Sequence, residues 1–161
     1  MATIKFKGLE EYEVMLSRLG KNTEKIAGEA IYAGAKIVAD EIRKGIEGLP
    51  VITGYGTQSD PLPGGVTATQ KKGLLDGLGI TPMAEKAGFY NVKIGFDGYN
   101  RTRTEQYPQG QPNQLVARGV ESGTSWKQKS PFIRPAVTRA KPQAEKAMAD
   151  VVDAATQKII E

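Results

Sequence analysis

The side chains that could do chemistry in this chain are carboxylates and lysines, because the sequence contains neither histidine nor cysteine. Without histidine, Ser-His-Asp hydrolases and His-ligated zinc or iron sites are excluded. Without cysteine, disulfides, thiolate metal ligands and thiol catalysis are excluded, and the redox compartment stays open. What remains is acid–base or nucleophilic chemistry by paired carboxylates or by a lysine.

The carboxylates do not form such pairs. Eight of them fall on stretches with helical periodicity, where solvated positions are expected: Glu10, Glu11, Glu13, Glu24, Glu29, Asp40, Glu41 and Glu47. The carboxylates outside the helical stretches share no close spacing that would indicate a two-metal site: Asp60, Asp76, Glu85, Asp97, Glu105 and Glu121. Glu121 alone has an unusual setting, next to Gly123-Thr124. As a catalyst it would lack a partner, whereas accepting backbone N–H groups or pairing with an arginine is the commoner role. We therefore expect no enzymatic activity and no cofactor or metal.

The length and net charge of the chain limit the number of domains and the kinds of partner that it can have. At 161 residues the chain is most simply one domain, residues 1–161, and is long enough to bury a core. Its 22 Lys+Arg and 18 Asp+Glu give a net charge of +4, with the basic residues scattered. This balance permits contact with nucleic acid but does not require it. No run approaches the ~18 apolar residues of a spanning helix, so we expect a soluble protein made in a cytoplasm, without membrane contact.

Apolar spacing predicts helices at both ends of the chain. Residues Thr3–Lys7 alternate in polarity, which predicts a short strand. A helix of about three turns is then expected to end at Gly20, and a second, capped by Asn22 or Thr23, to run to Gly48. Small residues on the second helix would let another helix or a sheet approach closely. A core helix is the simpler interpretation, and packing on a neighbouring subunit is the alternative. Val137–Glu161 is also helical in pattern, and we favour a longer helix that begins near Pro135 and is kinked at Pro142.

The middle of the chain contains two long polar loops, at about 50–69 and 97–113. Between them, Gln70–Leu78 could form a short helical turn, and the segment Phe89–Phe96 alternates as a strand does. It is expected to pair antiparallel with Gly79–Thr81 across a turn region. The predicted order is β-α-α-loop-β-β-α-α. This is an α+β domain, with a small antiparallel sheet flanked by a long N-terminal-half helix and a C-terminal helix.

The central stretch 117–137 is the most distinctive part of the sequence. It follows an apolar run, breaks at Glu121-Ser122-Gly123-Thr124, and passes through a loop with the only tryptophan, Trp126. It then continues as Pro131-Phe132-Ile133-Arg134-Pro135. The two prolines bias the residues before them, Ser130 and Arg134, towards extended backbone. Phe132 and Ile133 would be anchors on this stiff strip, either for a neighbouring molecule or for the chain's own core; buried Phe and Ile are usual.

The element order, and above all Glu121-Ser122-Gly123-Thr124 followed by Pro131-Phe132-Ile133-Arg134-Pro135-Ala136, resembles the neck and tail-completion proteins of long-tailed phages. In that family a Glu-x-Gly-Thr … Pro-Phe-hydrophobic-Arg-Pro-Ala signature precedes the last helix. Ser122 stands where an aromatic or aliphatic residue is usual. An upstream Thr-Gly-x-Leu of the family would map to Lys72-Gly73-Leu74-Leu75, where the glycine matches and the threonine does not.

The resemblance implies a non-catalytic virion protein that forms a homo-oligomeric ring, with six copies as the expected number. Such a ring would join the tail tube to the head-completion or connector proteins, as a tail-completion or tail-terminator component, and would let genomic DNA pass. The chain would be found in the phage neck, and in the host cytoplasm during assembly. The residues expected at the oligomer interface are those of the signature: Glu121, Gly123, Thr124, Pro131, Phe132, Ile133, Arg134 and Pro135.

Two other functions stay open at this point. The first is a small basic nucleic-acid-binding protein, whose DNA-facing residues would be Arg101, Arg103, Lys127 and Lys129. Arginines interleaved with Tyr99 and Tyr107 could contact a backbone or stack on bases, although a solvated loop is the simpler interpretation. The second is a histidine-free enzyme that uses Glu121, for which the sequence indicates no substrate.

Overall fold

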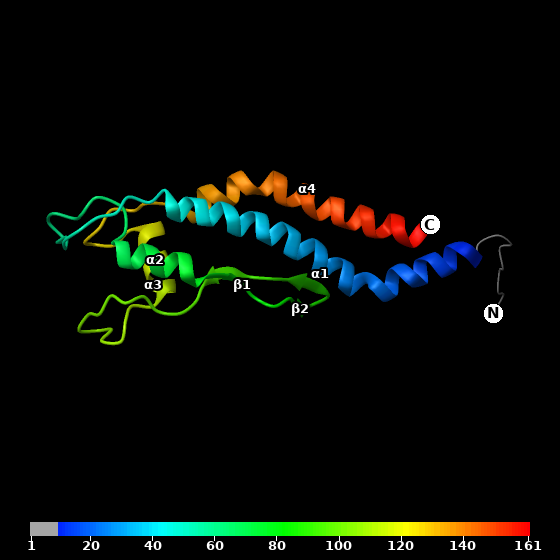
Figure 1. Cartoon of the computed structure of the whole chain (residues 1–161), viewed down its shortest axis with the longest axis horizontal. Helices are drawn as coiled ribbons and strands as arrows, with labels where there is room; N and C mark the ends of the chain where they lie inside the picture. The colour runs from blue at the N-terminus through cyan, green and yellow to red at the C-terminus, as the bar shows by residue number, and fades with distance from the viewer. Residues whose placement is uncertain (1–9) are drawn as a thin grey trace.

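The computed structural model describes the backbone of residues 10–161 and the side chains of residues 17–161. The strand expected at Thr3–Lys7 lies outside the described residues. The predicted α+β class is confirmed, with a long N-terminal-half helix and a C-terminal helix beside a small antiparallel strand region (Figure 1). In chain order the elements are α1 (Glu10–Glu47), α2 (Ala68–Gly77), β1 (Leu78–Ile80), β2 (Ala84–Lys86), β3 (Phe89–Asn91), β4 (Ile94–Phe96), α3 (Asn113–Ser122) and α4 (Ile133–Ile160).

The predicted division into two helices at Gly20 is wrong, because α1 continues through this glycine. The two residues expected to cap a second helix instead bond backwards within the first. The side-chain amide of Asn22 donates to the carbonyl of Arg18 at 2.8 Å, and the Thr23 hydroxyl donates to the carbonyl of Leu19 at 2.9 Å. A glycine inside a helix costs only about 1 kcal/mol relative to alanine, so a long helix can contain it.

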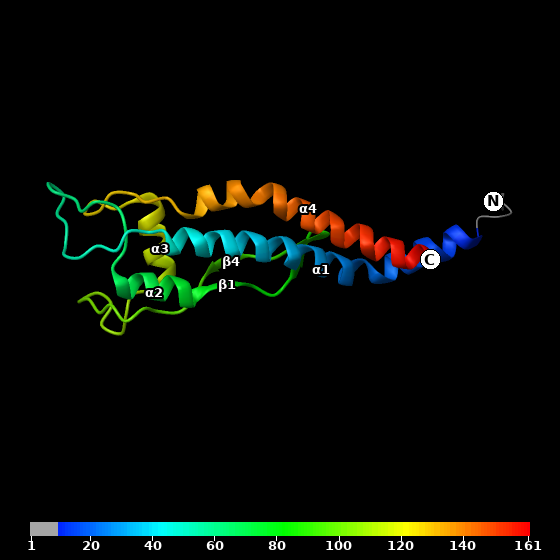
Figure 2. The same ribbon diagram turned by 45° about the horizontal axis from the view of Figure 1, so that its top comes forward.

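The two long helices lie side by side and run antiparallel (Figures 1 and 2). Small residues make the close approach possible, as predicted for this part of α1. A Cβ at Gly34 would lie only 2.7 Å from the Met148 side chain, and Ala136, Ala140 and Ala144 of α4 are buried. The prediction of a helix that begins before Pro142 is confirmed, because α4 begins at Ile133 and contains Pro142.

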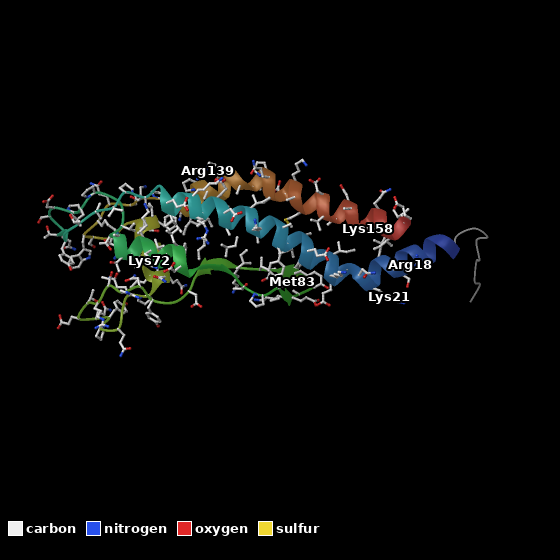
Figure 3. All side chains as sticks on the ribbon, in the orientation of Figure 1. Arg18, Lys21, Lys72, Met83, Arg139 and Lys158 are labelled. Carbon is white, nitrogen blue, oxygen red and sulfur yellow. The ribbon has the colours of Figure 1, made fainter. Side chains whose placement is uncertain are left out.

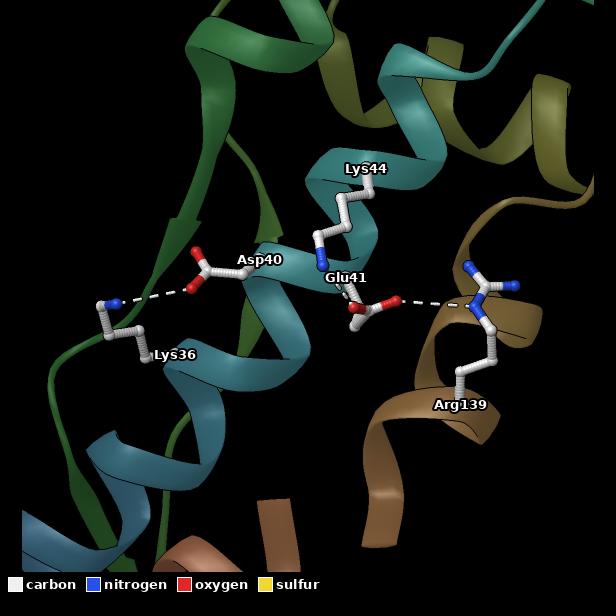
Figure 4. A network of polar contacts seen from close by, with 5 residues as sticks. All are labelled: Lys36, Asp40, Glu41, Lys44 and Arg139. Atoms are coloured by element: carbon white, nitrogen blue, oxygen red, sulfur yellow. Dashed lines mark hydrogen bonds and ion pairs between the residues drawn. The ribbon is translucent and has the colours of Figure 1, made fainter. Parts of the chain in front are cut away.

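A polar contact between Glu41 and Arg139 crosses between these helices (Figure 4). Glu41 of α1 accepts from Lys44 on its own helix at 2.9 Å and from Arg139 of α4 at 3.5 Å. The hydrogen bond from Lys44 is the main influence that lowers the pKa of Glu41, and Arg139 adds to it. Lys36 and Asp40 form a separate pair along α1. All of these side chains except the half-buried Glu41 are largely exposed, so these ion pairs contribute less to the helix pairing than the small apolar residues do.

The strand region is a long two-stranded ribbon rather than one sheet. The predicted antiparallel pairing of Gly79–Thr81 with the Phe89–Phe96 segment is confirmed for β1 and β4, where Gly79 faces Gly95. The single strand expected at 89–96 is wrong, because β3 is a separate strand that pairs with β2 in the region expected to be a turn. The Tyr32 hydroxyl holds the ribbon against α1: it donates to the Thr81 carbonyl at 3.3 Å and accepts from the Met83 N–H at 2.7 Å. Figure 3 labels Met83 at this contact.

The core lies where the end of α1 meets the two short helices and the start of α4. Its fully buried side chains come from all of them and from the loop after α1: Ile46, Leu74, Val66, Val120 and Ala136. The helical turn predicted at Gln70–Leu78 is confirmed as α2, which begins with a capping box between Thr67 and Gln70. The segment Asn113–Ser122 was not predicted as a helix; its first residue belonged to the expected loop 97–113. Val116 and Val120 are one helical turn apart and point into the core.

Candidate functional site

Glu121, the carboxylate singled out in the sequence, caps the start of α4. Its Oε2 accepts the backbone N–H groups of Phe132 and Ile133, both at 2.8 Å, and its Oε1 accepts that of Arg134 at 3.0 Å. The first turn of a helix leaves N–H groups without partners, and a negative charge there is favourable. A capping side chain usually comes from the residue just before the helix, but Phe132 cannot do this. Glu121, eleven residues upstream, does so instead. The predicted structural role of this residue, as an acceptor of backbone N–H groups, is confirmed.

The same contacts set the ionisation of Glu121. Burial by itself raises the pKa of this carboxyl, but the backbone N–H groups of Ile133, Arg134 and Phe132 lower it by more, so that the net shift is downward. The Arg134 guanidinium contributes weakly, because its Nε lies 4.0 Å from Oε1 and its side chain is 85% exposed. Glu121 is therefore a carboxylate whose oxygens are occupied by the helix start.

Gly123 and Thr124 turn the chain from α3 back towards that helix start. Gly123 ends α3 with φ of 78°, a conformation that favours glycine, and a Cβ there would lie 3.0 Å from the N of Lys129. Thr124 then forms a tight turn with Lys127, in which the Thr124 N–H donates to the Lys127 carbonyl at 2.9 Å. The two halves of the sequence signature are thus one structural unit, the capped joint, which we define as residues 120–124 together with residues 130–135.

The backbone of the proline strip, Pro131–Pro135, is not extended throughout. The expectation that Arg134 is extended is wrong, since Arg134 and Pro135 lie in the first turn of α4, where a missing N–H leaves no hydrogen bond unmade. Phe132 is 3% exposed, and its ring centroid lies 6.0 Å from that of Phe96 in an edge-to-face arrangement. Of the two alternatives for Phe132, the structure shows the one in which it fills the chain's own core. Pro131 and Arg134 are exposed, and Ile133 and Pro135 are half-buried.

Beside the capped joint is a groove of about 900 Å³ that sequence reasoning missed. Its walls come from the loop after α1, from α3, from the turn that contains Trp126, and from the threonines Thr102 and Thr104 of the second long loop. The loop and the turn are held together by the Leu62 N–H, which donates to the Trp126 carbonyl, and by the Gln128 N–H, which donates to the Leu62 carbonyl, both at 2.9 Å. Because these segments are far apart in the chain, no local pattern could have predicted the groove.

The groove is mainly apolar and carries two cations. Tyr55 is 97% exposed and Trp126 is 62% exposed, and both lie on its wall together with Leu115. Arg118 and Lys127 supply the positive charge, and none of the described residues that line the groove is a carboxylate. Burial lowers the pKa of the Lys127 ammonium, and no opposing charge among the described residues offsets this effect.

The four residues expected to face DNA are not equivalent. Arg101, Arg103 and Lys129 are exposed, whereas Lys127 is half-buried. Only Lys127 lines the groove; Arg101 and Arg103 alternate along their loop with Thr102 and Thr104, which do line it.

Within residues 17–161, no group of three or more acidic side chains could hold a metal ion. No helix in the described part of the chain is long and apolar enough to cross a membrane. Comparison with protein-family models, with curated proteins and with solved structures found no match for this chain.

Proposed function

We propose that this chain is a non-catalytic structural protein of a tailed-phage virion. Copies of it would form a closed ring at the head–tail junction, as a neck, tail-completion or tail-terminator component, with six copies as the expected number. The ring would join the tail tube to the connector or head-completion proteins and let the genome pass. The chain would then belong to the phage neck, after assembly in the host cytoplasm.

The observation that carries this proposal is the capped joint. Glu121, Gly123 and Thr124, which the family resemblance couples to the Pro-Phe-Ile-Arg-Pro strip, are also coupled in three dimensions through three backbone hydrogen bonds to the start of α4. A signature with this role serves architecture, because it fixes where the long C-terminal helix begins. It also leaves Glu121 engaged with backbone N–H groups rather than open to a substrate.

The shape of the molecule supports the same proposal. The paired helices α1 and α4 form an elongated body, with the ribbon along one flank and both long loops at the end where the core lies (Figures 1 and 2). A closed ring needs two different surfaces on each subunit that fit one another. An elongated body with distinct ends and flanks offers such surfaces.

The direct test is the particle size of the purified protein over a range of concentrations, together with its binding to purified tails. Our proposal expects a ring of fixed copy number, in solution or on tail tubes. A strict monomer that also fails to join tails would contradict it.

A nucleic-acid-binding protein is the alternative, and the exposure of Arg101, Arg103 and Lys129 favours it. This function predicts affinity for DNA that falls steeply with salt, because each neutralised phosphate releases counterions. Charge reversal of these three residues and of Lys127 should then weaken binding. Unchanged binding after all four reversals would exclude the predicted DNA-facing surface.

A further inference from the structure

The groove beside the capped joint contains a positive charge that has no counterion among the described residues. The ammonium of Lys127 is half-buried, burial alone shifts its pKa, and the second cation on the wall, Arg118, forms no ion pair with any described residue. A partly buried charge without a partner is unfavourable unless something else supplies the opposite charge. The apolar wall around it, with Trp126 and Tyr55 exposed, is unfavourable in water for a second reason.

These properties define the chemistry of the missing occupant. It must present apolar side chains to Tyr55, Leu115 and Trp126, and a carboxylate close to them for Lys127 or Arg118. An amphipathic helix with an acidic residue beside its apolar stripe satisfies both requirements, and helices of this kind commonly bind in apolar grooves.

One such surface occurs on this chain, over the last turns of α4. Val152 is 41% exposed and Ile160 is 55% exposed, and both are large apolar side chains. At 100° per residue, Val152, Asp153, Thr156 and Ile160 fall within an arc of about 100° on one flank of the helix. Asp153 is exposed and forms no ion pair with the described residues, unlike Asp150 of the same helix, which pairs with Lys146 at 2.8 Å. We call these four residues the α4 end stripe.

We propose that the groove of one copy binds the α4 end stripe of a second copy, with Asp153 placed against Lys127 and Arg118. This proposal rests on the proposed function, since it names the contact through which copies of the chain would join. The groove and the stripe lie at opposite ends of the elongated molecule (Figure 1). The contact is therefore between two different surfaces, which is the kind that closes into a ring when its rotation allows.

A second exposed apolar side chain, Phe89, fits the groove less well. Phe89, 75% exposed, projects from the ribbon, but its cross-strand neighbour is Lys86. A lysine beside the apolar anchor would be brought towards Lys127 and Arg118, and like charges at an interface are strongly unfavourable. The stripe on α4 has the complementary charge.

A charge exchange tests the contact. Lys127→Glu and Asp153→Lys should each weaken self-association, measured by sedimentation velocity over a concentration series, by about tenfold or more. The double variant Lys127→Glu/Asp153→Lys should recover part of the loss, because the pair with residue 127 is restored with reversed sign while Arg118 is unchanged. Lys129→Glu and Lys158→Glu are matched controls: both are exposed charges on the same segments outside the two surfaces, and Figure 3 labels Lys158. Thermal unfolding of each variant checks whether the fold is retained.

The outcomes separate this inference from the function on which it rests. If the wild-type chain assembles but neither single variant changes the assembly, the groove contact is wrong and the ring is formed by another surface. Two weakened single variants without recovery in the double variant also contradict the pairing of Lys127 with Asp153. If Lys127→Glu abolishes binding to a DNA duplex and leaves particle size unchanged, the groove serves nucleic acid instead. A wild-type chain that is monomeric at every concentration contradicts the proposed function itself.

Discussion

The capped joint and the groove lie side by side, yet they treat charge in opposite ways. In the joint, the carboxylate of Glu121 has three backbone N–H donors within 3.0 Å. In the groove, the ammonium of Lys127, six residues along the chain, has only burial acting on it. The carboxylate of Glu121, which has its hydrogen-bond donors within the chain, stabilises the fold. The ammonium of Lys127, which has no such partner among the described residues, indicates a surface that binds a partner.

The largest loss of stability is expected from removing the carboxylate of Glu121. Glu121→Ala should lower the free energy of unfolding by about 2–4 kcal/mol, because it removes a helix cap made of charge-assisted hydrogen bonds and leaves three N–H groups without their acceptor. Urea unfolding followed by circular dichroism measures it. Glu105→Ala, an exposed carboxylate on the second long loop, is the control and should stay within about 0.5 kcal/mol of wild type. An equal effect of the two substitutions would mean that the cap is not structural.

The stabilisation that Glu121 gives to the start of α4 should decrease as the pH falls. Because the folded-state pKa of Glu121 is lowered from 4.5, its stabilising effect is complete above that value and is lost as pH falls through the lower folded-state pKa. Glu121→Gln cannot titrate, so the difference in unfolding free energy between wild type and this variant should shrink in acid. Unfolding curves from pH 7 to pH 3 measure this difference. A gap that stays constant over the range would show that the charge of Glu121 does not act on α4.

Removing the ammonium of Lys127 should not destabilise the monomer, in contrast to removing the carboxylate of Glu121. Lys127→Met keeps the apolar stem and removes the ammonium, so the free energy of unfolding of the monomer should stay unchanged or rise by up to about 1 kcal/mol. Its self-association should nevertheless weaken. Thermal unfolding of dilute protein and sedimentation velocity measure the two properties. A clear loss of monomer stability would show that Lys127 has a structural partner, and would remove the contrast with Glu121.

The smallest loss of stability is expected from Arg134, whose exposed side chain forms the long ion pair with Glu121. Arg134→Ala should lower the free energy of unfolding by less than about 0.5 kcal/mol, because the ion pair with Glu121 is long and the arginine is 85% exposed. The same urea titration measures it, with Lys129→Ala as the control. A loss comparable to that of Glu121→Ala would mean that the ion pair, rather than the backbone cap, holds the joint together.

The sequence predicted those parts of the fold that depend on local pattern. The helical stripe of α4, the helical turn at α2 and the β1–β4 pairing all follow from apolar spacing. The structural role of Glu121 followed from its setting beside Gly123-Thr124. Predictions that used single residues as boundaries were less successful. Gly20 does not end a helix, because Asn22 and Thr23 bond back to the preceding turn and one glycine costs a helix only about 1 kcal/mol.

The candidate site could be predicted only in part, since tertiary contacts decide it. Pro135 suggests extended backbone at Arg134, but the Glu121 carboxylate places both residues in a helix start, where proline is favourable. Phe132 becomes a core residue because its ring packs edge-to-face against Phe96, the last residue of β4. The groove forms where segments meet that are up to 75 residues apart in sequence (Ile52 to Lys127), a separation over which periodicity carries no information.

The central claim is that copies of this chain assemble into a closed ring, and class averages from electron microscopy of the purified protein and of tails incubated with it test that claim most directly. We predict ring-shaped particles with one fixed rotational symmetry, six-fold in expectation, or a collar of the same symmetry at the tail end. Single subunits at every concentration, together with tails that carry no added density, would contradict the account.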